Sequence, residues 1–170
     1  MPGFEVIGKE EFDEIKDLFE NSKILFRHSF DHLRNNIYKV NEFENVFAKK
    51  MEAPYSLAVT SGTAALRVAL ATLDIKQGDE VITQSFTFVA TVEAIIESRG
   101  TPVITEVDDT LNMDPLDLEK KISPNTKAII VVHMLGTPSR LDQITEIAKK
   151  YNLPVIEDTA WGCGGRFNEI

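Results

Sequence analysis

The pattern of apolar and polar residues divides the chain into two regions. In the first, apolar side chains recur every three or four residues over Lys9–Asn21 and Asn41–Met51, which predicts two amphipathic helices. The stretch between them, Ser22–Val40, is mixed and basic, and we expect a connector there that could touch a partner or a ligand. We therefore predict an N-terminal helical segment over residues 1–52 and a second region over residues 53–170.

The second region alternates helical patterns with short β-branched runs. The predicted strands are Glu80–Thr83, Pro102–Val107, Lys127–His133 and Pro154–Asp158. The predicted helices lie over Ser61–Leu73, Phe88–Ile96, Pro115–Ile122 and Leu141–Tyr151. Such alternation predicts an α/β fold, a three-layer α/β/α arrangement around a mostly parallel sheet with right-handed crossovers.

Ligands of such sheets bind at the carboxyl ends of the strands. The residues that this topology places there are Gln84–Phe88, His133–Gly136 and Asp158–Gly165. We therefore expect the ligand-binding and catalytic residues in these three segments.

Composition narrows the class of protein. The 18 basic residues against 27 acidic ones give a formal net charge of −9, which argues against nucleic-acid binding. The single cysteine, Cys163, excludes an intrachain disulfide and a metal site made only of thiolates. No apolar run approaches the roughly 20 residues of a membrane span, and the acidic start is unlike a signal peptide. We expect a cytoplasmic protein that binds neither nucleic acid nor membranes.

The segment Thr60–Ala65 joins a short apolar run to a predicted helix. Backbone amides at a helix N-terminus lack partners within the helix, so those of Gly62, Thr63 and Ala64 would be free to bind an anion such as phosphate. The alternative is an ordinary cap by the side chain of Ser61 or Thr63. The motif alone leaves both interpretations open.

Three more residues follow predicted strands or end them. The carboxylate of Asp158 would emerge from a buried strand and need a partner, such as a cationic ring nitrogen, unless it serves as a cap or in an ion pair. Phe88 could stack on a flat cofactor or pack in the core. His133 could transfer a proton, contact a ligand, or be buried with its hydrogen bonds satisfied.

Other candidate sites are weaker. His28 and His32 have a spacing that suits zinc on a helix, with Asp31 beside them, but a third well-placed ligand is missing, so we expect no metal. Nothing near Cys163 in sequence would activate its thiol. The chain has neither a Walker-type loop nor a G-x-G-x-x-G motif, which disfavours nucleoside-triphosphate and nicotinamide enzymes.

Five motifs in order resemble the DegT/DnrJ/EryC1/StrS sugar aminotransferase family of pyridoxal-phosphate enzymes. They are Thr60–Leu66, Gly78–Ile82, Thr87–Thr91, Val132–Gly136 and Ile156–Ala160. The resemblance runs from about residue 40 to the end. It implies the large domain of an aspartate-aminotransferase type fold over residues 53–170, pyridoxal 5'-phosphate as cofactor, and a homodimer with active sites at the subunit interface.

The resemblance also implies roles for individual residues. Ser61, Gly62 and Thr63 would hold the cofactor phosphate, and Phe88 would stack on the pyridine ring. Asp158 would pair with the ring nitrogen and keep it protonated, so that the ring can absorb the electrons of a substrate carbanion. His133 and Trp161 are further candidate contacts.

The chain departs from the family pattern at three points. Trp161 stands where the family often has glutamine near the cofactor hydroxyl, and Arg140 stands where many relatives have aspartate. The lysine that forms the Schiff base lies in the family beyond the glycine-rich loop, and no lysine of this chain matches its position. We therefore expect the N-terminal part of an aminotransferase, inactive by itself.

The substrate expectation rests on smaller similarities. Met1–Glu5, Phe26–Phe30 and Asp158–Gly164 resemble the branch that makes 8-amino-3,8-dideoxy-manno-octulosonate for lipopolysaccharide. A nucleotide-linked keto-sugar of cell-surface sugar biosynthesis is the alternative substrate, with glutamate as amino donor in either case. Two alternative functions stay open: a related sugar 3-dehydratase, which uses the same cofactor with histidine in place of the lysine, and a short protein that binds without catalysis.

Overall fold

A computed structural model describes residues 3–166 of the chain. Within it the chain separates into two compact units, one up to Ala58 and the other from Val59 onward. No helix of the described part is long and apolar enough to cross a membrane.

The first unit contains the two predicted helices with shifted ends. Its elements are a short 3-10 helix at Phe4–Val6, α1 at Lys9–Asp17, a π-helix at Leu18–Ser22, a 3-10 helix at Asp31–Leu33, and α2 at Lys39–Lys50. The carboxylate of Glu11 accepts a hydrogen bond from the amide of Gly8 at 2.7 Å, which caps the start of α1. The prediction of one continuous α-helix over Lys9–Asn21 was wrong at its end, because the α-helix stops at Asp17 and the chain continues as a π-helix over Leu18–Ser22.

A buried carboxylate fastens the end of the first unit. Glu44 of α2 accepts the amide of Ala58 at 2.7 Å and is also paired with Arg27. Another guanidinium nitrogen of Arg27 donates to the carbonyl of Ala58 at 2.8 Å. The amide of Ala58, and after it Arg27, hold the pKa of Glu44 below its usual range although burial opposes them. The extended residues before Val59 are therefore bound to α2.

The second unit contains all of the predicted strands and helices. They are α3 at Gly62–Thr72, β1 at Glu80–Gln84, α4 at Val89–Glu97, β2 at Thr101–Thr105, α5 at Pro115–Lys121, β3 at Thr126–Val132, a 3-10 turn at Met134–Gly136, α6 at Leu141–Lys150 and β4 at Val155–Asp158. β2 ends two residues before the predicted Val107, which instead forms an isolated bridge with Met113. The predicted α/β class is confirmed.

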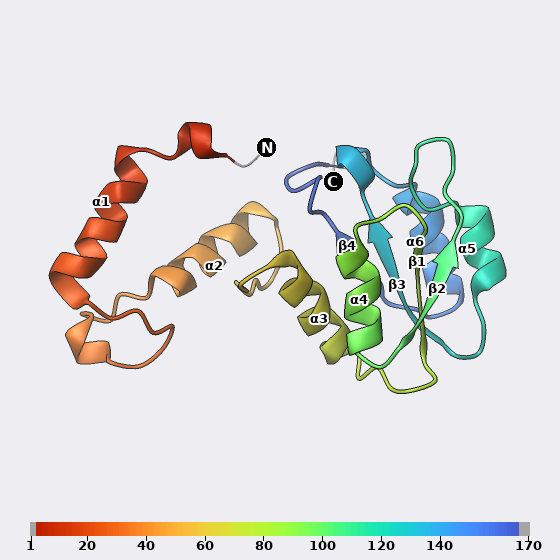
Figure 1. Ribbon diagram of the computed structural model, residues 1–170, viewed down its shortest axis with the longest axis horizontal. Coiled ribbons are helices and arrows are strands. Elements are labelled where there is room, and N and C mark those ends of the chain that lie inside the picture. Colours follow the sequence, from red (N-terminus) through yellow and green to blue (C-terminus); the bar gives the residue numbers. More distant parts are fainter. Residues whose placement is uncertain (1–2, 167–170) are drawn as a thin grey trace. The chain divides into compact units, whose positions relative to one another are not determined.

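The four strands form one parallel sheet in the order β2-β1-β3-β4. Helices α3 and α4 cover one face of it, and α5 and α6 cover the other (Figure 1). Along β3, Ala128, Ile130 and Val132 pack on the α3–α4 face. Ile129 and Val131 pack on the α5–α6 face. β3 is therefore apolar on both sides, as expected for a covered parallel strand.

The strand order places a topological switch point between β1 and β3. From β1 the chain crosses the α3–α4 face to reach β2, whereas from β3 it crosses the α5–α6 face to reach β4. The loops that leave these two adjacent strands therefore diverge, and such a switch point is where open α/β sheets bind ligands.

Candidate functional site

The start of α3 offers unpaired backbone amides. The hydroxyl of Ser61 accepts a hydrogen bond from the amide of Ala64 at 3.1 Å, so the predicted helix cap exists. This cap does not use the amides of Gly62 and Thr63, for which the described part of the chain provides no hydrogen-bond partner. Capping and anion binding are therefore compatible at this turn, since each uses different N–H groups.

Asp158 is the last residue of β4 and lies opposite Val132 in the register. Ile156, two residues earlier in the same strand, packs on the α3–α4 face. Side chains alternate along a strand, so Asp158 turns to that face and Glu157 turns to the other. The Asp158 carboxylate accepts one hydrogen bond, from the amide of Ala160 at 3.1 Å, and has no ion-pair partner within residues 3–166. Most of its hydrogen-bonding capacity is thus available to a ligand.

Phe88 stands immediately before α4 with 71% of its surface exposed. The alternative of a core phenylalanine was therefore wrong. The hydroxyls of Thr87 and Thr91 lie 2.9 Å apart and join the residue before Phe88 to the first turn of α4. An aromatic ring held next to a helix start and open to solvent is suited to stacking on a flat ligand.

The structure brings these three features to one edge and one face of the sheet. α4 follows β1, so its first turn lies at the carboxyl edge, and α3 leads into the start of β1, so its own first turn also lies at that edge. Asp158 ends β4 at the same edge and turns to the α3–α4 face. The start of α3, the exposed ring of Phe88 and the carboxylate of Asp158 therefore lie at the same edge and on the same face of the sheet.

His133 turns to the opposite face. It follows Val132, which packs on the α3–α4 face, and its Nδ1 accepts the amide of Ser139 at 3.1 Å. Its Nε2 lies 3.2 Å from Oε2 of Glu157, and this hydrogen bond holds the pKa of Glu157 below its usual range although partial burial opposes it. His133 is thus a buried histidine with satisfied nitrogens, and the structure does not bring it to the side of Asp158.

A cavity of about 320 Å³ lies beside this histidine on the α5–α6 face. His133, Pro138, Leu141, Glu157 and Thr159 contribute to its walls. Since Glu157 faces it and Asp158 does not line it, the cavity is separate from the features gathered around the start of α3.

The loop after β4 carries Trp161 and Cys163. The amide of Gly162 donates to the carbonyl of Thr159 at 3.0 Å, and Trp161 is left 58% exposed, with no polar contact of its ring within residues 3–166. The thiol of Cys163 is free and exposed. Neither His28 nor His32 belongs to a group of three metal-binding side chains, of which residues 3–166 contain none.

Two buried side-chain amides, those of Gln84 and Asn112, hold the loops at the carboxyl edge of the sheet, and the sequence analysis did not single them out. Gln84 accepts the amide of Val132 at 3.2 Å and donates to the carbonyl of Phe86 at 3.0 Å. Asn112 accepts the amide of Met134 at 2.9 Å and donates to the carbonyl of Thr137 at 3.2 Å. The only signal in the sequence was a glutamine at the end of a strand, within the segment already expected at this edge.

Arg140, the second departure from the family pattern, bridges two loops. Its guanidinium contacts Asp108 at 2.7 Å and Asp109 at 3.0 Å. Burial would raise the pKa of Asp108, but hydrogen bonds from Thr110 and the charge of Arg140 outweigh it and lower that pKa. The residue thus attaches the start of α6 to the loop after β2.

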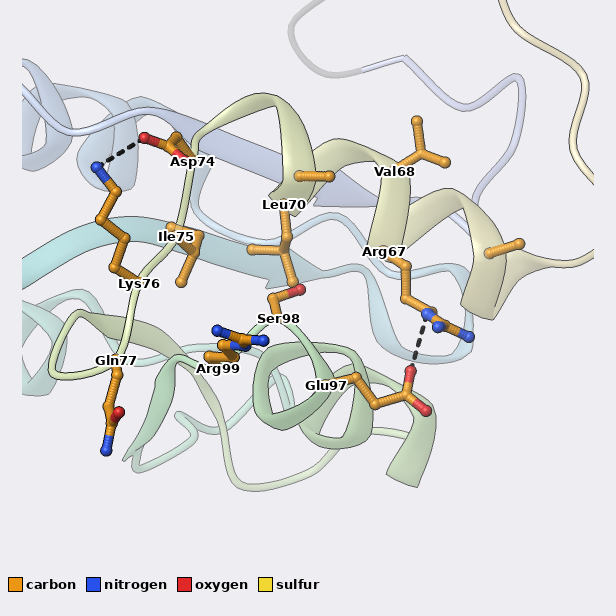
Figure 2. A pocket seen from close by; sticks show the side chains of 12 residues that line it. Arg67, Val68, Leu70, Asp74, Ile75, Lys76, Gln77, Glu97, Ser98 and Arg99 are labelled. Carbon is orange, nitrogen blue, oxygen red and sulfur yellow. Dashed lines mark ion pairs between the residues drawn. The ribbon is translucent and has the colours of Figure 1, made fainter.

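A larger hollow, of about 770 Å³, lies between the C-terminal parts of α3 and α4. Figure 2 shows Arg67 reaching across it to Glu97, with 2.9 Å between the charged atoms, and Lys76 paired with Asp74 at 2.8 Å. It lies toward the amino edge of the sheet, away from Asp158, because α3 and α4 both run from the carboxyl edge to the amino edge.

Known proteins are similar to this chain in sequence and in fold. dTDP-3-amino-3,6-dideoxy-alpha-D-galactopyranose transaminase of Aneurinibacillus thermoaerophilus is 45% identical over 131 residues, 76% of this chain and 36% of the relative. The structure of NtdA from Bacillus subtilis with bound cofactor PMP has a TM-score of 0.82 and 32% identity, covering 97% of this chain and 37% of NtdA. GDP-4-keto-6-deoxymannose-3-dehydratase has a TM-score of 0.80 and 27% identity, covering 93% of this chain and 40% of the other.

This chain thus spans little more than a third of the length of the relatives it matches. Residues 22–169 match the family model described as the DegT/DnrJ/EryC1/StrS aminotransferase family. The match covers most of the chain and includes both the start of α3 and Asp158. The chain belongs to the DegT/DnrJ/EryC1/StrS aminotransferase family.

Proposed function

We propose that this chain forms part of a pyridoxal-phosphate site in an aminotransferase that acts on a nucleotide-linked keto-sugar. The observation that carries the proposal is the common edge and face shared by the free amides of Gly62 and Thr63, the ring of Phe88 and the carboxylate of Asp158. Family membership supports the reaction class, and the transaminase from Aneurinibacillus thermoaerophilus supports the substrate class.

The chemistry of these side chains fits the cofactor. The two amides and the capped turn at Ser61 suit a phosphate group. Phe88 is exposed enough to stack on the ring and exclude water from one side of it. Asp158 can hold a proton on the ring nitrogen, because among residues 3–166 its carboxylate accepts a hydrogen bond only from the amide of Ala160. When bound, pyridoxal phosphate supplies the electron sink for the carbanion formed at the amino-bearing carbon.

The proposal also covers the amine that transfers the proton, the oligomeric state and the location of the protein. No lysine of the chain occupies the motif position, so we assign the proton-transferring amine to residues outside this chain. The expected homodimer and cytoplasmic location belong to the same proposal. Sedimentation of the intact protein would show the dimer directly.

Binding of pyridoxamine phosphate to the intact protein tests the cofactor assignment. Asp158→Asn replaces the proton-holding carboxylate by an amide, and we expect the affinity to fall about tenfold or more. Glu157→Gln is the matched control, because Glu157 precedes Asp158 but turns to the other face, and its affinity should stay within about twofold of the unsubstituted protein. Unchanged affinity in Asp158→Asn would overturn the assignment.

The substrate is tested by following nitrogen from labelled glutamate. Transfer of the label to a nucleotide-linked keto-sugar is the expected result. The 8-oxo form of 3-deoxy-manno-octulosonate belongs in the same assay, since the similarity of Met1–Glu5 and Phe26–Phe30 is the basis for that second substrate. Release of water from the sugar without label transfer would move the assignment to the 3-dehydratases, which the similarity to the GDP-sugar dehydratase makes the second candidate.

A further inference from the structure

Arg34 carries a buried positive charge that has no acidic partner among residues 3–166. Its side chain lies in the first unit and the residue is only 8% exposed. One terminal nitrogen donates to the carbonyl of Phe26 at 2.6 Å, and the guanidinium carbon lies 4.8 Å from the centre of the Tyr38 ring. The Nε atom is the one buried side-chain nitrogen or oxygen in residues 3–166 that has no hydrogen-bond partner.

Four carboxylates of the first unit near this cavity are engaged elsewhere. Asp17 accepts a hydrogen bond from the side-chain amide of Asn21 at 2.5 Å. Glu14 pairs with Lys39 at 2.7 Å, and Glu44 pairs with Arg27. Asp31 accepts a hydrogen bond from the hydroxyl of Tyr38. None of them forms an ion pair with Arg34 in the described part of the chain. A guanidinium cannot lose its proton to escape burial, so an unpaired one is costly and calls for an anion.

A cavity lies against this guanidinium. It has a volume of about 560 Å³, lies entirely within the first unit between α1 and the segment that follows it, and is lined in part by Arg34. Ile15, Leu18, Ile37 and Val40 give it an apolar wall. Its volume falls in the range of small-molecule sites. The cavity is also lined by the carboxylates of Glu14 and Asp17 and by the cations Arg27 and Lys39. Arg27 and Lys39 are each paired with a carboxylate, so Arg34 is the lining cation that has no such partner in the described residues.

We propose that this cavity binds a small oxyanion, a phosphate or a carboxylate on a compact apolar body, with Arg34 as its charged contact. The guanidinium supplies planar donors whose spacing matches either group. The apolar wall holds the organic part of the ligand. The proposal stands on the first unit alone and does not depend on the cofactor site of the second unit.

The test uses the Nε–H signal of Arg34 in the full chain, observed by NMR and assigned by its loss in Arg34→Lys. Phenyl phosphate and benzoate are the probes, because each joins one of the two oxyanions to a small apolar ring. We expect a saturable shift of this signal and of the amides of Ile15 and Ile37 with at least one probe. Saturation by one probe alone identifies the oxyanion that the site prefers.

Sodium chloride at matched ionic strength separates binding from a general salt effect. Shifts that stay linear with probe concentration, or that sodium chloride reproduces, would overturn the proposal. The amide shifts of Ile15 and Ile37 are read in the unsubstituted chain, so they decide the question even where a variant of Arg34 fails to fold.

Variants add a second arm. Arg34→Lys keeps the charge but loses the planar fork, and we expect it to weaken binding about fivefold or more, with Arg34→Gln weaker still. Arg67→Gln is the matched control, because Arg67 is an exposed, ion-paired arginine of the second unit, and it should bind as the unsubstituted chain does. Equal binding by Arg34→Gln and Arg67→Gln would also overturn the proposal.

Discussion

Nε2 of His133 lies 3.2 Å from Oε2 of Glu157, while Nδ1 of the same ring accepts the amide of Ser139 at 3.1 Å. Because Nδ1 accepts the amide of Ser139, Nε2 is the ring nitrogen that is left to donate a hydrogen bond to the carboxylate. This contact joins the ends of β3 and β4 on the α5–α6 face. It fixes the residue before Asp158 without involving Asp158 itself.

The same contact predicts a pH dependence of stability. Because the folded pKa of Glu157 lies below its ordinary value of 4.5, its contribution is fully present above that pH and is lost as the pH falls through the folded pKa. The side chain is 47% exposed, so we expect a contribution of only about 0.5 kcal/mol. Urea unfolding of Glu157→Gln at several pH values should show a correspondingly shallower loss of stability in acid.

Glu146→Gln, at an exposed position of α6, is the control for this series and should keep the acid slope of the unsubstituted chain. Identical slopes for Glu157→Gln and the unsubstituted chain would contradict the assigned role.

The cap of α3 is tested by Ser61→Ala. Loss of the hydroxyl that accepts the amide of Ala64 should lower the free energy of unfolding by about 1 kcal/mol, measured by urea unfolding. Ser85→Ala is the control, since Ser85 is exposed and its hydroxyl makes no hydrogen bond in the described residues. Equal stability of the two variants would rule out a stabilising cap.

Ser61→Asp separates capping from phosphate binding at the same turn. An aspartate caps as well as a serine, so stability should be unchanged. Its negative charge should nevertheless lower the affinity of the intact protein for pyridoxamine phosphate, because the free amides of Gly62 and Thr63 lie beside it. Affinity equal to that of the unsubstituted protein would place the phosphate elsewhere.

Asn112 lies in a loop, but we expect it to contribute strongly to the free energy of unfolding. It is fully buried and joins the loop after β2 to the turn after β3 through Met134 and Thr137. Asn112→Ala leaves the buried amide of Met134 and the carbonyl of Thr137 without their partner, which should cost about 2 kcal/mol in urea unfolding. Asn125→Ala, at an exposed turn, should cost less than about 0.5 kcal/mol, and a similar loss for both would contradict this role.

Gly136, in the turn after β3, and Gly164, in the loop after β4, form a matched pair for testing how closely these two loops approach each other. Both have positive φ, 82° and 84°, but an added Cβ would lie 3.2 Å from the carbonyl oxygen of Trp161 at Gly136 and meet nothing within 4 Å at Gly164. Gly164→Ala should cost about 1 kcal/mol for its backbone conformation alone. Gly136→Ala should cost about 2 kcal/mol, and equal thermal stabilities of the two would contradict the close approach.

The sequence predicted the second unit well because its pattern and its packing agree. The helix at Gly62–Thr72 and the strand at Thr126–Val132 lie where periodicity and β-branched residues indicated. The direction of His133 could not be predicted, because a strand that is apolar on both faces has no alternation that marks a side. Only the packing of Val132 against the α3–α4 face determines it.

The first unit was harder to predict for a different reason. The widened turn at Leu18–Ser22 differs from an α-helix by one hydrogen-bond spacing, which no residue pattern encodes. Arg34 was one of several basic residues in a mixed connector, and arginine is usually exposed. Its burial follows from contacts with Phe26 and Tyr38, which become neighbours only through the tertiary fold.

The strand order also sets the sequence in which the sheet can assemble during synthesis. β1 leaves the ribosome first and can pair with β2 through the short α4 crossover, but its other edge stays open until β3 has been made and inserted beside it. An unpaired apolar edge is prone to pairing with other chains. When β3 pairs with β1, the open edge passes to β3, which stays unpaired on its outer side until β4 follows. The nascent chain is therefore vulnerable to aggregation from the emergence of β2 until that of β4, and β4 is the segment that ends this interval.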